Sequence, residues 1–264
     1  MAEPNPEELF NLGVKSIEAK DYIQAKKYFE KACDLNDGVG CGALGDLYYY
    51  GQGVEKNLTK AAQFYSKACD LKEGMGCSRL GRLYYYGEGV EKDLIKAAYF
   101  YSKACDLNDG VGCSNLGFLY GSGKGVKQDS KKATTLLEKA CDLKESLGCK
   151  NLGVLYQNGQ GVEKDLIKAA YFYSKACELK EGLGCGALGG LYYNGEGVKK
   201  DLIKAAYFSS KACELNNGLA CGLLGVLYEY GRGVEKDLTK ATQFYSKACK
   251  LGFKKACEML KGLK

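Results

Sequence analysis

Residues 48–77 read YYYGQGVEKNLTKAAQFYSKACDLKEGMGC, and residues 84–113 read YYYGEGVEKDLIKAAYFYSKACDLNDGVGC. The second stretch begins 36 positions after the first, and each contains two cysteines separated by eight positions. The whole chain repeats this arrangement as seven cysteine pairs with the same period: Cys33 and Cys41, Cys69 and Cys77, Cys105 and Cys113, Cys141 and Cys149, Cys177 and Cys185, Cys213 and Cys221, Cys249 and Cys257. A fixed period of this length is typical of a repeat array in which each unit packs on its neighbours. We therefore predict that the 264 residues form one array rather than separate globular domains.

The first half of each repeat predicts a short helix. Leu44, Leu47 and Tyr48 fall at i, i+3 and i+4, which places them on one helical face. Gly51 and Gly53 follow and end that helix. Asn57 then stands where an N-cap is needed before LTKAAQFYSKACDL, and aspartate occupies the same place later in the chain, at Asp93, Asp165, Asp201 and Asp237.

The second half of each repeat predicts another amphipathic helix. Its apolar stripe consists of Leu58, Ala61, Tyr65, Ala68 and Cys69. Small residues in both halves, such as Gly45 and Ala61, allow two helices to approach closely, and no alternating pattern indicates a strand. The short segment DLNDGVG predicts a tight turn in which a glycine reverses the chain between repeats. The expected fold is all-α, an α/α solenoid of about seven antiparallel helix pairs in a right-handed stack.

These residues carry a family resemblance. LGxLY followed by AxxxYxxA resembles the tetratricopeptide repeat, and a loop of the form GxGV lengthens the repeat to 36 residues, which resembles the Sel-one-like repeat (SLR). One C-x7-C per repeat together with KACDL is similar to the Helicobacter cysteine-rich protein family, over residues 8–264. The resemblance divides the chain into a flexible N-terminus (1–7), a tetratricopeptide-like first repeat (8–37), six SLR repeats (38–253) and a C-terminal capping helix (254–264).

The cysteine pairs favour local disulfides. The last turn of one helix and the first turn of the next would bring Cys33 and Cys41 within bridging distance. Each closed loop of about nine residues would contribute roughly 2.5 kcal/mol by restricting the unfolded chain. Reduced core thiols and metal ligands are the alternatives, but zinc sites use C-x2–4-C spacing and often histidine, which this chain lacks. We expect seven bridges within C-x7-C pairs and no metal or cofactor.

Disulfides indicate an oxidising compartment, so we expect a secreted or periplasmic protein. The first ten residues, MAEPNPEELF, contain no basic n-region or apolar h-region of a signal peptide, which a start methionine ahead of a mature form would explain. No apolar run is long enough to span a membrane. The formal charge of +6 arises from 38 basic and 32 acidic residues without a concentrated basic stripe, which disfavours nucleic-acid binding. We expect a monomer.

Catalytic motifs are absent from the sequence. Without histidine there is no Ser-His-Asp triad, and none of the serines is followed by lysine three positions later, as S-x-x-K requires. The recurring G-x-G lacks the lysine of a phosphate loop, and its place in every repeat indicates a structural connection between helices. The family resemblance nevertheless implies a penicillin-binding protein with weak β-lactamase activity. Such an activity would need an irregular arrangement of serine, lysine or tyrosine in a groove.

A stack of helix pairs presents an extended concave surface, which the first helix of each pair lines in tetratricopeptide arrays. Counted from the motif leucine (Leu44 in its repeat), the inward positions lie two and one before it, and two, five and six after it. The residues at these positions differ between repeats, whereas scaffold positions such as Leu44 and Tyr48 recur. This variation indicates either a groove that reads a non-repeating ligand or drift of exposed positions. The tyrosines at Tyr48, Tyr84, Tyr120, Tyr156, Tyr192 and Tyr228 are expected in the core.

The predicted binding groove consists of Tyr49, Tyr50, Arg82, Tyr85, Tyr86, Asn115, Phe118, Lys150, Asn151, Asn158, Tyr193 and Asn194. Tyrosine and arginine dominate binding hot spots. Asn115, Lys150 and Asn151 partly resemble the clamp with which some tetratricopeptide domains hold a peptide. We expect a secreted interaction protein that binds an extended peptide or a host surface protein. The alternatives are a penicillin-binding protein that takes β-lactams and a periplasmic adaptor that engages cell-wall fragments.

Overall fold

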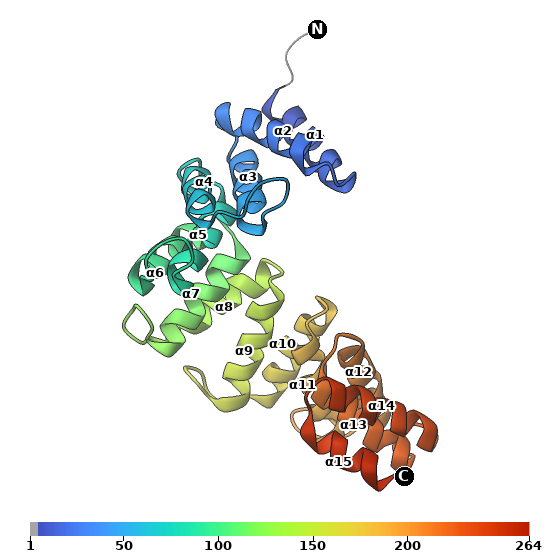
Figure 1. The fold of residues 1–264 in the computed structure, drawn as a ribbon. Helices are drawn as coiled ribbons and strands as arrows, with labels where there is room; N and C mark the ends of the chain where they lie inside the picture. The colour runs from blue at the N-terminus through green and yellow to red at the C-terminus, as the bar shows by residue number, and fades with distance from the viewer. Residues whose placement is uncertain (1–4, 264) are drawn as a thin grey trace. The chain divides into compact units, whose positions relative to one another are not determined.

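A computed structural model describes residues 5–263, and within that range the chain forms fifteen α-helices and no strand (Figure 1). This architecture confirms the predicted all-α repeat fold. The helices are α1 (Pro6–Glu18), α2 (Tyr22–Asp34), α3 (Gly38–Tyr50), α4 (Leu58–Asp70), α5 (Gly74–Tyr86), α6 (Leu94–Asp106), α7 (Gly110–Ser122), α8 (Ser130–Asp142), α9 (Ser146–Asn158), α10 (Leu166–Glu178), α11 (Gly182–Asn194), α12 (Leu202–Glu214), α13 (Gly218–Tyr230), α14 (Leu238–Lys250) and α15 (Lys254–Gly262).

The chain divides into two compact units, the first ending at Leu143 and the second beginning at Lys144. The first unit contains α1 to α8 and the second contains α9 to α15. Within each unit, every odd-numbered helix before α15 packs most closely against the even-numbered helix that follows it. Side chains of α3, α4 and the neighbouring helix α5 belong to one apolar core in the first unit.

Helix ends follow the capping residues that the sequence predicts. The Asn57 side chain accepts a hydrogen bond from the backbone N–H of Lys60 at the start of α4. Aspartates serve the same purpose at α6, α10, α12 and α14. Gly51 ends α3 in the left-handed conformation, with φ of 70°. A side chain at this φ would be strained, which explains why each first helix of the pairs from α3 to α13 ends at glycine.

The turn between repeats corrects one prediction. Gly38, the glycine of DLNDGVG, does not reverse the chain but opens α3. The left-handed residue is Asn36, with φ of 61°, and the next repeat has Lys72 there, with φ of 64°. Asparagine tolerates this conformation because its short polar side chain can hydrogen-bond to the nearby backbone. The residue that makes the turn is therefore Asn36 and not the predicted glycine.

The core repeats with the sequence. Leu44, Leu47 and Tyr65 are almost fully buried in the first unit, and Leu152, Leu188, Leu191 and Leu224 are their leucine counterparts in the second. Gly45 is required where α3 meets α4, since a Cβ on it would lie only 2.6 Å from the Tyr65 ring. Glycine on one helix therefore makes room for a large aromatic residue on the other.

The cysteines pair as predicted. Six bridges join Cys33–Cys41, Cys69–Cys77, Cys105–Cys113, Cys177–Cys185, Cys213–Cys221 and Cys249–Cys257, with Cα–Cα distances between 4.5 and 4.9 Å. Cys141 and Cys149 are disulfide-bonded as well. Each described cysteine is therefore oxidised, one bridge per repeat.

The tyrosines expected in the core are only partly there. Tyr48 and Tyr156 are buried, 9% and 8% exposed. The other four are partly exposed: Tyr84, Tyr120, Tyr192 and Tyr228. Five of the six, the two buried ones included, stack on a phenylalanine of the second helix, as Tyr84 does on Phe100 at 5.5 Å. The ring lies at the edge of the helix pair because the residue 21 positions after the motif leucine, such as Tyr65, already fills the centre.

The chain ends in helices on both sides. Asn5 caps α1 through a reciprocal pair of hydrogen bonds with Glu8. Helix α1 begins at Pro6, inside the segment 1–7 that was expected to be flexible. Residues 1–4 of that segment lie outside the described range. The last helix, α15, falls within the expected capping segment 254–264. In residues 5–263 no helix combines the length and apolarity that crossing a membrane requires.

Candidate functional site

Two adjoining hollows lie on the first unit, over the first helices of successive pairs. The larger has a volume of about 300 Å³ and is lined by Asp46, Tyr50, Tyr65, Met75, Ser78, Arg79, Arg82, Asp109, Val111 and Asn115. The smaller, of about 170 Å³, is lined by Phe10, Val39, Gly42, Ala43, Asp46, Glu73, Met75, Gly76 and Arg79. Asp46, Met75 and Arg79 belong to both. We call the two hollows together the first-unit groove.

An ion pair separates the two hollows. Arg79 on α5 places Nη1 2.8 Å from Oδ2 of Asp46 on α3. The other carboxylate oxygen of Asp46 accepts a hydrogen bond of 2.7 Å from the Tyr65 hydroxyl. The Arg79 guanidinium also lies 5.8 Å from the Tyr65 ring centroid. Three helices thereby hold one polar cluster in a fixed geometry at the floor of the groove.

A second cluster carries Arg82. Its guanidinium lies over the Tyr49 ring, 4.5 Å from the centroid. The Tyr49 hydroxyl donates a hydrogen bond of 3.0 Å to Glu88, and its ring meets Tyr50 edge-on at 4.9 Å. Tyr50 is 63% exposed, so it offers an aromatic face to a ligand. These contacts fix the Arg82 side chain while leaving it beside the larger hollow.

Burial sets the protonation properties of the floor. Desolvation raises the pKa of Asp46 above its ordinary value of 3.8, although Arg79, the Tyr65 hydroxyl and Arg82 act in the opposite direction. Burial, together with the neighbouring Asp46 carboxylate, raises the pKa of Tyr65. The Tyr65 hydroxyl therefore keeps its proton at neutral pH and remains the donor in its bond to Asp46. The pKa of Tyr49 is also raised, first by burial and then by Glu88.

The structure brings four of the predicted residues together. Tyr50, Arg82 and Asn115 line the larger hollow, and Tyr49 supports Arg82 from behind. Outside that lining, Tyr85 packs against the core cluster that contains Tyr101, and Tyr86, 61% exposed, meets Tyr85 edge-on. Phe118 on α7 is exposed, with the Lys124 ammonium 5.3 Å from its ring centroid.

The predicted residues of the second unit make local contacts. Lys150 donates a hydrogen bond to its neighbour Asn151, and Asn194 donates one to Glu196. The Tyr193 hydroxyl accepts a hydrogen bond of 3.2 Å from Arg232, and Asn158 is exposed. Asn115 belongs to the first unit and Lys150 to the second, so the clamp that combines them stays a prediction.

Several residues of the groove were not selected from the sequence. Asp46 and Ser78 stand at inward positions of the register, and Arg79 immediately precedes its motif leucine, as Asn115 does. The register could therefore have identified all three. Met75 and Val111 lie in the first turn of their helices, before the register begins, and only the packing of α5 and α7 shows that they line a hollow.

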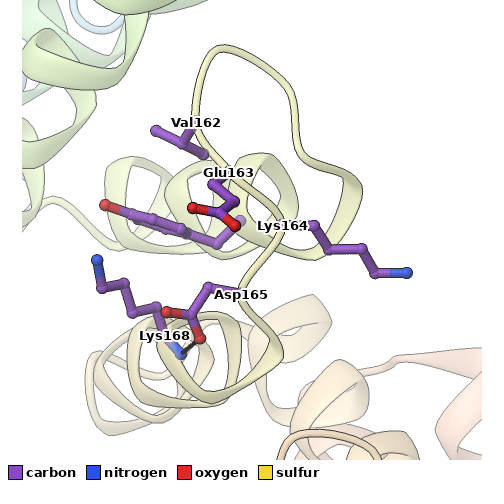
Figure 2. A pocket seen from close by; sticks show the side chains of 6 residues that line it. Val162, Glu163, Lys164, Asp165 and Lys168 are labelled. Carbon is purple, nitrogen blue, oxygen red and sulfur yellow. Dashed lines mark hydrogen bonds between the residues drawn. The ribbon is translucent and has the colours of Figure 1, made fainter.

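A third hollow, of about 430 Å³, lies on the second unit at the loop between α9 and α10 (Figure 2). Two of its charged residues are engaged in local structure: Asp165 accepts from the backbone N–H of Lys168 at 2.9 Å, and the Lys168 ammonium lies 5.1 Å from the Tyr156 ring centroid. Lys164 extends away from the other side chains (Figure 2). The sequence VEKD of this loop recurs at residues 90–93 and 234–237. Because the loop that lines this hollow has a recurring sequence, whereas the residues of the first-unit groove differ between repeats, the first-unit groove is the better candidate.

Helix pairs that are joined to the following helix by one disulfide each, with a polar and aromatic groove on the first helices, define an oxidised α/α solenoid built from repeats. The model of the Sel1 repeat matches residues 9–37, 39–73, 74–109, 110–145, 146–181, 183–217 and 218–259. The chain belongs to the Sel1 repeat family, whose repeats are protein-interaction modules.

Known relatives support this assignment. The putative beta-lactamase HcpC of Helicobacter pylori is 63% identical over 60 residues, which are 23% of this chain and 21% of that protein. The match therefore spans about a fifth of the length of this relative. The resemblance to Helicobacter cysteine-rich proteins is confirmed.

Two solved structures share the fold over most of the chain. One is a protective antigen of uropathogenic Escherichia coli with an SLR fold, 27% identical with a TM-score of 0.84, covering 98% of this chain and 56% of that one. The other is a Sel1 repeat protein from Oxalobacter formigenes, 26% identical with a TM-score of 0.78, covering 91% and 96%. The paired cysteines and the similarity to the Helicobacter cysteine-rich proteins together indicate an extracytoplasmic protein.

Proposed function

We propose that this protein is a secreted interaction protein whose first-unit groove binds an extended segment of a partner protein. The observation that carries the proposal is the hollow of about 300 Å³ across α3, α5 and α7, which combines Arg82, Tyr50 and Asn115. Arginine and tyrosine are among the residue types enriched at binding hot spots, and here a stacked arginine lies in one hollow with an exposed tyrosine. A host surface protein is the partner that a secreted form would meet.

The groove suits a main chain as well as side chains. Asn115 carries an amide that can both donate to and accept from peptide groups. Met75, 48% exposed, offers a flexible apolar surface between the two hollows. The floor is already held by Asp46, Arg79 and Tyr65, so little of it has to be ordered on binding.

A peptide selection tests this function. A display library of about nine randomised residues, which spans roughly 30 Å when extended, is selected on the purified protein. Selected peptides are then measured against Arg82→Gln. We expect Arg82→Gln to weaken binding by about tenfold or more, as hot-spot arginines do. Arg232→Gln is the matched control, because Arg232 also stacks on a tyrosine, at 5.2 Å from the Tyr230 centroid, but lies in the second unit.

Peptides that bind both variants like the wild type would contradict the proposed site. The melting temperature of each variant is recorded as well, since a loss of folding would lower binding without any contact to the peptide.

β-Lactam hydrolysis is the second candidate, and it comes from the names of the Helicobacter relatives. The serine in the larger hollow, Ser78, donates its hydroxyl hydrogen bond to the Met75 carbonyl oxygen at 3.1 Å rather than to a basic side chain. The groove therefore favours binding over acyl transfer. Turnover of nitrocefin above buffer, with one acylated serine found by mass spectrometry, would establish the enzymatic function instead.

A further inference from the structure

We propose that the first-unit groove selects the side-chain carboxylate of an internal glutamate or aspartate in the bound segment, and that Arg82 binds this carboxylate. This inference rests on the proposed function and names the chemistry of the partner. It begins with the charges that face the larger hollow, which are those of Asp46, Arg79, Arg82 and Asp109.

Three of these four charges are already compensated. Arg79 and Asp46 form an ion pair at 2.8 Å. Asp109 caps α7, where its carboxylate accepts a hydrogen bond from the Gly112 N–H and faces the positive end of the helix dipole. Arg82 is different, because in the part of the chain that the structure describes no carboxylate oxygen lies within salt-bridge distance of it. The hollow therefore holds one cation that forms no direct ion pair, although Arg82 acts on the nearby Asp46 carboxylate through its charge.

The geometry of Arg82 prepares it for a carboxylate. Stacking on Tyr49, at 4.5 Å from the ring centroid, uses the face of the guanidinium. One part of its edge also meets the Tyr49 hydroxyl, and the remaining N–H groups are left for a ligand. An arginine edge matches a carboxylate with two parallel N–H···O bonds. Asn115 lines the same hollow, and its side chain makes no hydrogen bond to any described residue, so its amide can donate to the same group.

The adjoining hollow indicates an internal residue rather than a chain terminus. The smaller hollow begins on the other side of Asp46 and Arg79, and Phe10, Val39 and Met75 give it an apolar lining. A segment whose carboxylate meets Arg82 can continue across the ion pair and place an apolar side chain there. The partner segment is thus extended, with an acidic residue and an apolar residue a short distance apart.

Matched peptides test the inference. The selected peptides carry blocked termini, and each is made with glutamate or aspartate and with the corresponding amide. We expect the amide form to bind the wild-type protein about 10- to 100-fold more weakly, the usual range for a charge-assisted hydrogen bond. On Arg82→Gln the acid and amide forms should bind equally, whereas on Arg232→Gln the full preference should remain. Arg82→Lys, which keeps the charge without the planar edge, should retain only part of it.

Three results would overturn the inference. One is equal binding of acid and amide forms to the wild-type protein, and another is an acid preference that survives in Arg82→Gln. The third is a preference that appears only when the C-terminus is left free, which would assign Arg82 to a terminal carboxylate. In each of these cases peptides still bind the groove, so the proposed function stands; a selection without any groove-dependent peptide would remove both.

Discussion

At the residue scale, Ser209 is the clearest departure from the repeat. Its position holds Tyr65, Tyr173 and Tyr245 in other repeats, and each of these donates its hydroxyl hydrogen to a side chain of the first helix. Ser209 is 0% exposed, and its hydroxyl finds no hydrogen-bond partner among residues 5–263. A buried polar group without a partner costs free energy.

We expect Ser209→Ala to raise the free energy of unfolding by about 1 kcal/mol, because it removes this desolvated hydroxyl at almost constant volume. Urea denaturation measures the change. Ser210→Ala is the control, since the Ser210 hydroxyl is hydrogen-bonded to Glu214 on the surface and its removal should not stabilise the protein. A destabilised Ser209→Ala variant would show that the hydroxyl has a partner in solution.

Asp46 predicts a pH dependence. Burial raises its pKa above 3.8 in the folded protein, so the folded state holds this proton more tightly than the unfolded state. The contribution of Asp46 to stability is therefore fully present below pH 3.8 and is lost as the pH rises through the raised pKa. We expect the unfolding free energy of the wild type, minus that of Asp46→Asn, to fall with rising pH in this window. Urea titrations at several pH values measure it, and a difference that grows with pH would mean that Arg79 dominates instead.

At the scale of the element, the turns between repeats carry strain that varies along the chain. Asn36 and Asn108 both adopt φ of 61°, whereas Lys72 adopts φ of 64° at the same place. Lysine has no local hydrogen bond to offset the left-handed conformation, whereas asparagine does.

Lys72→Asn should therefore stabilise the protein by roughly 0.5 kcal/mol, and Asn108→Lys should destabilise it by a similar amount. The midpoint of urea denaturation is the readout for both. Two changes of the same sign would refute the interpretation, because the pair exchanges the same residues at equivalent turns.

Element boundaries follow from local chemistry, and this is why they were predictable. Asn57 and Gly51 act on backbone groups within a few residues of themselves, so the sequence around them is sufficient. The turn was misjudged because Gly38 and Asn36 are both turn formers, and only the backbone shows which of them takes positive φ.

At the scale of the whole molecule, disulfides with the same spacing each stabilise one junction of the array. Each disulfide links cysteines eight positions apart, at the junction between one helix pair and the next helix. Because each loop is equally short, each bridge should contribute a similar amount, roughly 2.5 kcal/mol, through the entropy of the unfolded chain.

Removal of one internal bridge, as in Cys105→Ala with Cys113→Ala, should lower the unfolding free energy by about that amount. Removal of Cys249 and Cys257 should have a smaller effect on the main transition, because that bridge ties down only the terminal helix α15, which can open separately. Hydrogen exchange distinguishes the two cases. Equal loss of protection along the whole chain in both variants would contradict the expected independence of the repeats.

The sequence by itself determined the period, the helices, their caps and the cysteine pairing, because each depends on residues that are near one another in the chain. Cys33 and Cys41, for example, are joined by a single short turn, so their spacing is enough to place them together. The register also identified Tyr50, Arg82 and Asn115 as neighbours in a groove, because a repeat translates the same position from helix to helix.

Only the tertiary structure decided how that groove is charged. Asp46 and Arg79 are 33 positions apart, and their ion pair depends on how α3 packs beside α5 and on where Tyr65 of α4 places its hydroxyl. A repeat pattern gives each residue a place on its own helix, but it does not say which of two nearby arginines reaches the carboxylate. The packing assigns Arg79 to Asp46 and stacks Arg82 on Tyr49, which leaves Arg82 as the charge available to a partner.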